Sequence, residues 1–364
     1  MRRLFIVSAA TGYGGAERSI EIIARHLPDT IETTIYAAHP EHIFQLRNAA
    51  STRGNLRIRR ISARPRRLSR RLTALSLLAD FRREMPDAVL VNTHASALLC
   101  AIMARFAPEL AERSFLFVRD FQWQDLDHLF DRLPRARVLV PNEVVAERTG
   151  YLFPFHVGPD RRPVSVVPDM VELPVAVEDD GTGEFLHLAT INRFKGHSDL
   201  MLAMHRLKVA GKAVSVRSAG YVGDGPLYRN LLALRETLGL EKTFAFAGHV
   251  SDPAPLLARC RAVVVPSVSH STGPETFGRA VIEAWAHRKP VIAYAAGGPA
   301  RLISDGEDGL LVPEGDTGGL ADAMARLQDN PQLCRRLGEA GYIKAAKHYE
   351  AKTVTEQLLG VLGL

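Results

Sequence analysis

The feature that most constrains the fold of this 364-residue chain is a series of short apolar runs, rich in β-branched residues, that occurs twice. Within each series the runs alternate with longer stretches of helical pattern, such as "AERSIEIIARHL". Buried strands interleaved with helices are typical of parallel sheets that helices cover on both faces. The second series begins after about residue 183, and the chain is longer than one hydrophobic core usually serves. The sequence therefore predicts two doubly wound α/β domains. The apolar runs are "LFIVSAA", "TIYAA", "AVLVNT", "SFLFVRD", "RVLVPN" and "VSVVPD", followed by "FLHLATI", "VSVRSAG", "FAFAGHV", "AVVVPSV", "PVIAYA" and "GLLVPEG".

The boundary between the two series lies in "PDMVELPVAVEDDGTGE" (168–184), which is rich in proline, glycine and acidic residues, as linkers are. We expect an N-terminal domain over residues 1–170 and a C-terminal domain over residues 171–344. A helix at about 345–364 is expected to pack back on the first domain. Open parallel sheets bind ligands beyond the carboxyl ends of their strands. Two such sheets facing a central cleft would place the functional residues just after the strands.

Cysteine content and hydropathy indicate a cytoplasmic protein without a membrane-spanning segment. Cys100, Cys260 and Cys334 are isolated and form no paired framework, which fits a reducing compartment. The opening "MRRLFIVSAATGYGGAE" imitates a signal peptide, but its apolar run is short and leads into a glycine turn, so a buried first strand explains it better. No uninterrupted apolar run reaches the roughly 18–20 residues that span a bilayer.

The positive charge of the chain is concentrated in its first half. Residues 1–165 hold 25 arginines and 17 acidic residues, and segment 53–84 alone holds 11 of these arginines. In "RPRRLSRRLTALSLLADFRRE" the leucines at 68, 72, 75 and 78 recur at helical spacing beside arginines. Such a basic amphipathic stripe is able to lie on anionic lipid, and the alternative is a solvated helix that packs its leucines on the domain. Nucleic acid is not expected as a partner, because no aromatic residues are interleaved with the basic ones. The candidate membrane-contact residues are Arg66, Arg67, Arg70 and Arg71.

A glycine-rich turn, "TGYGGAERS", follows the first expected strand. Its glycines allow backbone N–H groups to approach an anion or a sugar at a helix N-terminus, although a plain tight turn explains them equally well. The turn is a poor dinucleotide fingerprint, because Glu17 stands where a third glycine or alanine is needed. A dehydrogenase is therefore disfavoured.

The second series opens with "TINRFKG", in which Arg193 and Lys195 follow a strand end. This is a usual place for phosphate ligands, and a solvated basic loop is the alternative. The glycines around Asp224 in "AGYVGDGPL" follow another strand and are read as a turn.

The segment "PETFGRAVIEA" (274–284) places two glutamates on either side of a Thr-Phe-Gly turn. A helix is expected to begin at about Thr276, and its free N–H groups suit a diphosphate. Glu275 and Glu283 would then lie roughly 12 Å apart along the helix axis, close to the distance between the ribose and the hexose of a nucleotide-sugar. Because a carboxylate accepts two hydroxyl hydrogen bonds, each glutamate is suited to one sugar ring.

The ordered set of motifs resembles the family 4 glycosyltransferases. The resemblance rests on "GGAERSI", "VVPDMV", "GDGPL" and "PETFGRAVIEAWAHRKPVIAYAAGG…SDGEDGLLVPEGD", and it extends over essentially the whole chain. It implies the two-domain GT-B fold and retaining transfer of a sugar from a nucleotide-sugar, with neither a metal ion nor another cofactor.

The resemblance also implies roles for individual residues. Glu275 would hold hydroxyls of the donor sugar, and Glu283 the ribose. His94 is, with Glu275, a candidate catalytic residue. The other candidates are Lys195 on the phosphates, the backbone of Thr276, Phe277 and Gly278 at the diphosphate, Gly14 and Gly15 on the N-terminal side, and Arg119 and Asp120 on the acceptor side.

Three positions depart from the pattern of the family. Ala189-Thr190 stands where the family has Gly-Arg, so Arg193 is the candidate that replaces this charge. Arg301 stands where the "GG-x-x-E" motif has its glutamate, and Arg119 replaces a common histidine.

We therefore expect a retaining glycosyltransferase that acts on a saccharide or lipid-linked acceptor in cell-surface polysaccharide or glycolipid synthesis, at the inner membrane face. Front-side attack, with the leaving phosphate helping to deprotonate the acceptor, is favoured over a covalent route through Glu275. Two alternatives stay open: a nucleotide-sugar epimerase or hydrolase on the same fold, and a non-catalytic nucleotide-sugar binding protein.

Overall fold

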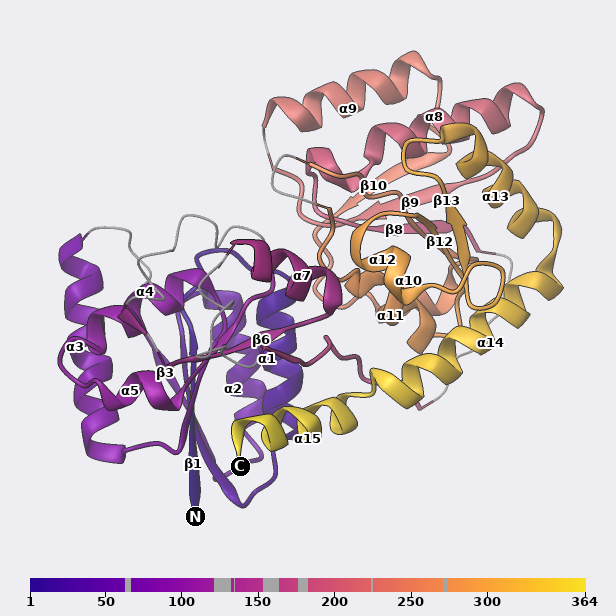
Figure 1. Cartoon of the computed structure of the whole chain (residues 1–364). Coiled ribbons are helices and arrows are strands. Elements are labelled where there is room, and N and C mark those ends of the chain that lie inside the picture. Colours follow the sequence, from indigo (N-terminus) through magenta and orange to yellow (C-terminus); the bar gives the residue numbers. More distant parts are fainter. Residues whose placement is uncertain are drawn as a thin grey trace. The chain divides into compact units, whose positions relative to one another are not determined.

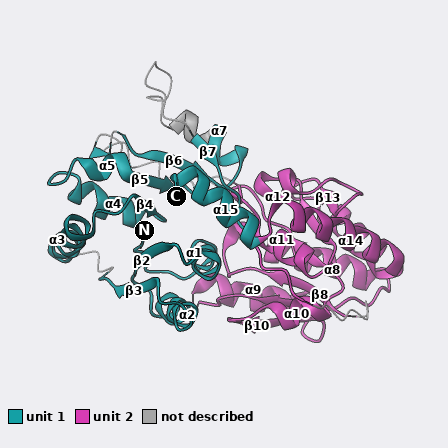
Figure 2. Cartoon of the chain, turned by 90° about the horizontal axis from the view of Figure 1, so that it is seen from below, with its two compact units in different colours: residues 1–170, 351–364 teal, residues 171–350 magenta. Residues whose placement is uncertain are grey.

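The computed structural model describes residues 1–62, 67–120, 132–133, 135–152, 164–175, 183–223, 225–270 and 274–364. The chain forms two compact units: unit 1 comprises residues 1–170 and 351–364, and unit 2 comprises residues 171–350 (Figure 2). Of the residues that the sequence analysis names, Arg66 and Asp224 lie outside the described residues, as does the side chain of Arg67.

Unit 1 is built on a parallel sheet with helices packed on it (Figure 1). The sheet has seven strands in the order β3-β2-β1-β4-β5-β6-β7. The order runs one way from β1 to β3 and the other way from β4 to β7, so it reverses between β1 and β4. A parallel sheet with such a reversal is doubly wound, and the reversal marks its usual ligand-binding point. The strands are β1 (Arg2–Ser8), β2 (Ile31–Ala37), β3 (Leu56–Arg60), β4 (Ala88–Val91), β5 (Ser114–Phe117), β6 (Arg137–Val140) and β7 (Val164–Val166).

Helices cover both faces of this sheet. Successive strand residues point to opposite sides, and the apolar side chains on each side need to be buried. In β1, Leu4 and Ile6 pack into one buried cluster and Phe5 and Val7 into the other. The first cluster includes residues of α1 (Gly15–His26), α2 (Pro40–Ala50) and α15 (Ala351–Leu362). The second includes residues of α3 (Arg67–Glu84), α4 (His94–Met103), α5 (Glu109–Arg113) and α7 (Glu143–Leu152). The last helix of the chain is thus part of the core of unit 1.

Unit 2 repeats this construction with a six-stranded parallel sheet of order β10-β9-β8-β11-β12-β13, which reverses between β8 and β11. One face packs against α8, α9 and α13, the other against α10, α11 and α12, and α14 contributes to both clusters. The strands are β8 (Phe185–Leu188), β9 (Val216–Ala219), β10 (Phe244–Gly248), β11 (Val263–Val265), β12 (Val291–Tyr294) and β13 (Leu310–Val312). The helices are α8 (His197–Val209), α9 (Pro226–Thr237), α10 (Ala254–Arg259), α11 (Arg279–Ala286), α12 (Gly297–Leu302), α13 (Thr317–Asp329) and α14 (Pro331–His348).

The prediction of two doubly wound α/β units is confirmed, but one helix boundary was wrong. The sequence analysis expected the helix at 276, whereas α11 begins at Arg279. Gly278 has φ = +96°, in the left-handed region, so it ends the preceding turn and cannot continue a right-handed helix.

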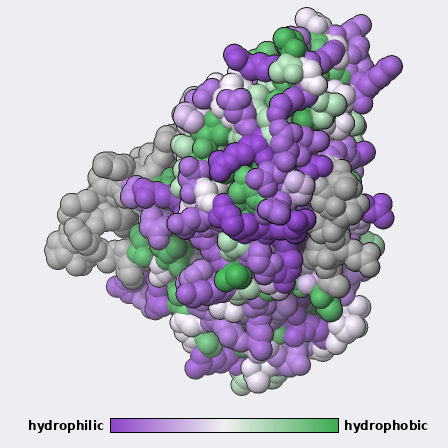
Figure 3. Space-filling view, turned by 90° about the vertical axis from the view of Figure 1, so that its right-hand side faces the viewer, coloured by the Kyte–Doolittle hydropathy of each residue, from purple (hydrophilic) through white to green (hydrophobic). Residues whose placement is uncertain are grey.

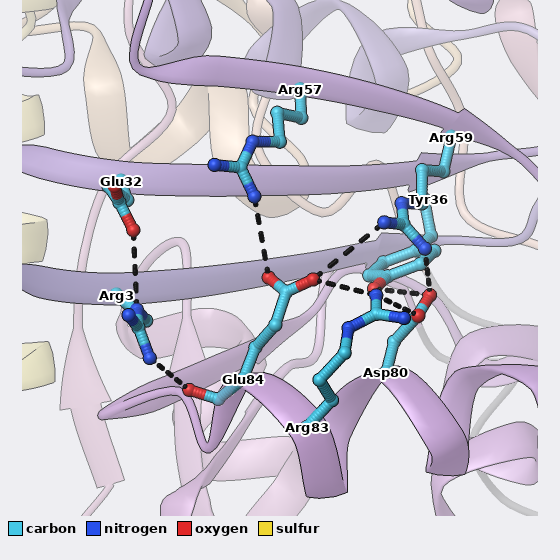
Figure 4. A network of polar contacts seen from close by, with 8 residues as sticks. All are labelled: Arg3, Glu32, Tyr36, Arg57, Arg59, Asp80, Arg83 and Glu84. Atoms are coloured by element: carbon cyan, nitrogen blue, oxygen red, sulfur yellow. Dashed lines mark hydrogen bonds and ion pairs between the residues drawn. The ribbon is translucent and has the colours of Figure 1, made fainter.

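The C-terminal half of α3 is tied to the edge of the unit 1 sheet by a polar network (Figure 4). Asp80, which is 6% exposed, accepts hydrogen bonds from Tyr36 (3.1 Å), Arg59 (2.5 Å) and Arg83 (2.6 Å). Glu84 adds ion pairs, including one of 4.0 Å to Arg57. Several arginines of the basic segment are therefore balanced internally.

The face of the molecule in Figure 3 is mostly hydrophilic, with apolar residues scattered among polar ones. Among the helices in the described ranges, none combines the length and the apolarity needed to cross a bilayer.

Candidate functional site

The candidate site of unit 2 lies where the strand order reverses. β8 and β11 are neighbours in the sheet; the segment after β8 carries Lys195, and the segment after β11 carries Glu275. Lys195 Nζ donates a hydrogen bond of 2.8 Å to Glu275 Oε1. The two side chains are only 19% and 13% exposed. The structure thus brings together two of the residues that the sequence predicted for donor binding.

The position of Lys195 is set by a tight turn. Residues Arg193–Lys195 form one turn of 3₁₀ helix, and Lys195 N donates to Asn192 O at 3.1 Å. Gly196 follows with φ = +70°, and a Cβ there would lie 1.8 Å from the carbonyl oxygen of Pro266. Only glycine fits this approach. The turn is therefore pressed against the segment that follows β11.

Glu275 is held by groups from three strand ends. Its carboxylate accepts hydrogen bonds from Lys195 and from the hydroxyl of Ser267, and its backbone oxygen accepts one of 2.8 Å from Gly298 N, which follows β12. Burial alone would raise the pKa of this carboxyl, but the charge of Lys195 and the hydrogen bonds from Lys195 and Ser267 outweigh burial and lower it. Glu275 is thus an ionised acceptor at neutral pH.

The second predicted glutamate lies further along the same segment. Glu283 is in the second turn of α11, where its Oε1 accepts a hydrogen bond of 3.1 Å from Arg279 Nη2. Both side chains are 13% exposed. Residues 276–278 connect Glu275 to α11, whose first N–H groups lack partners within the helix and favour an anion. Arg193 is exposed and makes no polar contact with another described residue, so it does not join this cluster.

The candidate residues of unit 1 also lie at a reversal of strand order. Gly14 precedes α1, which follows β1, and His94 is the first residue of α4, which follows β4. Glu17 Oε2 accepts a hydrogen bond of 2.9 Å from Gly14 N and so fixes the glycine turn. Burial raises the pKa of Glu17. His94 is partly exposed and has no polar contact with another described residue.

The structure gives Arg119 different surroundings from those expected of a residue that contacts an acceptor. Its guanidinium forms an ion pair with Asp169, and its carbon atom lies 3.7 Å from the centroid of the Phe117 ring. The side chains of Arg119 and Asp169 are 7% and 8% exposed. Asp169 also accepts a hydrogen bond of 2.7 Å from Ser19 Oγ in α1. Arg119 is thus part of a buried polar cluster, while Asp120 is partly exposed.

Sequence reasoning missed the residues that support the site. Glu17 stands three residues after Gly14, as the glutamate of a capping box does after its N-cap, so the hydrogen bond from Gly14 N to its carboxylate had a usable signal, although glycine has no side chain for the reciprocal bond. Ser267 and Asp169 carried no such signal, because each meets its partner only through the packing of the sheet.

A cavity of about 690 Å³ lies at the end of the unit 2 sheet where the strands begin, opposite to the end that carries Lys195 and Glu275. Its lining includes Glu184, Arg217, Arg259 and Arg261, which belong to the starts of strands or to the segments before them. This cavity therefore does not coincide with the polar cluster around Lys195. Among the described residues, no group of three or more His, Cys, Asp or Glu side chains is placed to hold a metal ion.

The sequence of unit 2 matches a known family. Residues 173–344 match the family model described as "Glycosyl transferases group 1". The chain is 34% identical over 141 residues to the lipopolysaccharide core biosynthesis glycosyltransferase LpsE of Rhizobium meliloti, and these residues cover 39% of this chain and 40% of that protein. It is 33% identical over 168 residues to the putative glycosyltransferase EpsD of Bacillus subtilis, covering 46% and 42%. The chain thus spans about two fifths of the length of these curated relatives.

Solved structures resemble the chain over its whole length. Anabaena Alr3699/HepE in complex with UDP-glucose aligns with a TM-score of 0.81 at 19% identity, and covers 100% of both chains. The apo form of the lipopolysaccharide outer core galactosyltransferase WaaB aligns with a TM-score of 0.69 at 16% identity, covering 100% of this chain and 99% of that one.

Proposed function

We propose that this chain, whose residues 173–344 match the group 1 glycosyl transferases and whose fold is that of HepE, is a GT-B glycosyltransferase that moves a sugar from a nucleotide-sugar to a saccharide or lipid-linked acceptor. The observation that carries the proposal is the ion pair between Lys195 and Glu275 at the reversal of strand order in unit 2. In a sugar diphosphate, the cation suits the phosphates and the ionised carboxylate suits the hydroxyls of the sugar.

Donor binding exchanges the partners of this pair. The diphosphate takes Lys195 and the N–H groups at the start of α11, and Glu275 turns to the hydroxyls of the donor sugar. Ser267 continues to hold the second carboxylate oxygen. Glu283 exchanges Arg279 for the ribose hydroxyls.

In the reaction, the bond between the anomeric carbon and the diphosphate oxygen breaks, and the acceptor oxygen bonds to the same face of that carbon. The acceptor proton passes to an oxygen of the leaving phosphate. Negative charge grows on the diphosphate, and Lys195 with the helix N–H groups stabilises it from fixed positions. This mechanism retains the anomeric configuration and requires no metal ion. In unit 1, His94 is the proposed catalytic residue and Asp120 the proposed acceptor-side residue.

The substitution Glu275→Gln tests this function. It keeps the shape of the side chain but removes the charge, so kcat should fall by at least about 100-fold, with a smaller effect on donor affinity. Glu307→Gln, at an exposed position, is the matched control and should leave kcat unchanged. A Glu275→Gln enzyme with near-normal kcat would contradict the role. Sugar release without any acceptor would identify a hydrolase instead.

The donor and the metal requirement need separate tests. HepE binds UDP-glucose in its solved complex, so a UDP-sugar is the first donor to try, with acceptors from lipopolysaccharide or exopolysaccharide. EDTA should leave the activity intact, and a loss that Mg²⁺ or Mn²⁺ restores would refute the metal-independent mechanism.

We also propose that α3 attaches the protein to anionic lipid at the inner membrane face. Leu68, Leu72 and Leu75 are 70%, 60% and 49% exposed. Their spacing of four and three residues places them on one side of the helix. Arg71 is also exposed, next to this apolar ridge. Leu78, which the sequence analysis grouped with the other leucines, instead lies in the core and is 5% exposed.

Vesicle co-sedimentation tests the attachment. Changing Leu68, Leu72 and Leu75 together to serine should abolish binding to vesicles rich in phosphatidylglycerol. The double change Arg70→Gln and Arg71→Gln should weaken vesicle binding and make the remaining binding less sensitive to salt. Leu202→Ser, at a half-exposed leucine of unit 2, is the control. Activity on a soluble acceptor should survive all these changes. Undiminished binding by the triple leucine variant would contradict the proposal.

A further inference from the structure

Two buried histidines lie beneath the turn that carries Lys195. His187 is in β8 and His197 is the first residue of α8, and each is 2% exposed. Their ring centroids are 4.4 Å apart, with the rings edge to face. Neither imidazole has a part in the mechanism proposed above.

The contacts of His187 define its protonation. Its Nε2 lies 3.1 Å from the backbone oxygen of Lys195, and its Nδ1 lies 3.3 Å from Ser218 Oγ on the neighbouring strand β9. A carbonyl oxygen only accepts, so Nε2 carries the hydrogen and donates it. Nδ1 then accepts from the hydroxyl of Ser218. A neutral ring therefore satisfies both hydrogen bonds.

The electrostatic surroundings favour the same neutral form. Burial lowers the pKa of His187 far below its ordinary value, and the nearby His197 and the charge of Lys195 lower it further. A protonated ring would place a second positive charge under the lysine. Nδ1 would also lose its ability to accept from Ser218.

We infer that His187 is a positioning residue for Lys195. The N–H at its Nε2 anchors the backbone carbonyl of Lys195, while the side chain of the same residue reaches Glu275. The turn is also held by the hydrogen bond from Lys195 N to Asn192 O, by one of 2.8 Å from Val268 N to Phe194 O and by the approach of Gly196 to Pro266, but only His187 holds the carbonyl oxygen of Lys195 among the described residues. Losing the anchor moves Nζ away from the diphosphate. This inference rests on the proposed donor-binding function of Lys195.

Isothermal titration calorimetry tests the inference with UDP, or with whichever of GDP and ADP binds more tightly. His187→Phe keeps the bulk of the ring but removes the donor, so affinity for the nucleoside diphosphate should fall about tenfold, the value of one well-placed hydrogen bond. Affinity for the nucleoside should not change. His187→Gln restores an N–H near the position of Nε2 and should recover most of the loss.

A double variant separates positioning from packing. In a Lys195→Ala background, His187→Phe should cause no further loss of affinity, because the side chain that it positions is absent. His197→Phe is the matched control, since His197 packs on the same ring without contacting Lys195 O, and it should change affinity less than twofold. An equal loss in the Lys195→Ala background, an equal effect of His197→Phe, or unchanged binding by His187→Phe would overturn the inference. A wild-type protein that binds no nucleoside diphosphate would instead refute the proposed function.

Discussion

Each unit of the molecule holds a cation and a carboxylate together near the carboxyl ends of its strands, but the two pairs have different surroundings. Arg119 and Asp169 in unit 1 lie between the Phe117 ring and the hydroxyl of Ser19. Lys195 and Glu275 in unit 2 lie between two turns, and both of these turns lead into helices. The first pair is closed in by a ring and by α1, whereas the second is bordered by backbone that suits an anion.

This difference separates a structural ion pair from one that a ligand is able to open. A buried pair that no ligand replaces contributes mainly by avoiding an uncompensated charge. A pair beside the N-terminus of a helix has an alternative partner available for its cation. The comparison therefore predicts that breaking the first pair affects stability and that breaking the second affects ligand binding.

The largest effect is expected in unit 1. Arg119→Met leaves Asp169 charged and buried, so the free energy of unfolding should fall by about 3–5 kcal/mol. Arg119→Met combined with Asp169→Asn should recover at least half of this loss, because no buried charge remains. Urea denaturation of both variants measures the effect. A stable Arg119→Met protein with a much reduced kcat would instead support the acceptor-side role that the sequence suggested.

The acid stability of unit 2 is the next expected effect. Burial, with the nearby Lys195, lowers the pKa of His197 to about 4, and the pKa of His187 is lowered as well. The unfolded chain binds these protons below about pH 6.5, so stability is complete above that pH and is lost as the pH falls toward 4. The loss due to His197 is on the order of 3 kcal/mol. Denaturation curves of His197→Phe should depend less on pH in this window, and an unchanged dependence would contradict the assignment.

The smallest effect concerns affinity. Lys195→Ala should weaken binding of the nucleoside diphosphate about 30-fold, the value of a hydrogen bond to a charged group, with little effect on the nucleoside. Arg193 makes no polar contact with another described residue, so Arg193→Ala should have a smaller effect, about fivefold. Calorimetry compares the two variants directly. Equal effects would mean that both charges reach the phosphates.

The fold could be predicted because its cause is local. Apolar strands and helical periods alternate along the chain, and alternation of this kind leaves few arrangements other than parallel sheets with helices on both faces. The start of α11 could not be read in the same way. The sequence does not say that Gly278 adopts a left-handed conformation, so the helix was expected about three residues too early.

Some residues of the candidate site could likewise be predicted from the sequence, and others could not. Lys195 and Glu275 were found because they stand beside recognisable glycine turns after strands. Ser267, His187 and Asp169 were not found, because their contacts join segments that only the sheet brings together. Arg119 was expected to contact the acceptor, because the sequence does not reveal that a buried carboxylate, that of Asp169, lies beside it.

Hydrogen–deuterium exchange of the whole protein with and without UDP tests the central claim most directly. The account predicts that UDP slows exchange in residues 193–196 and 275–281, because their turns and the start of α11 hold the diphosphate, and leaves residues 117–120 unchanged. The account would be contradicted if protection were confined to residues 117–120, or to the arginine-lined cavity where the strands of unit 2 begin.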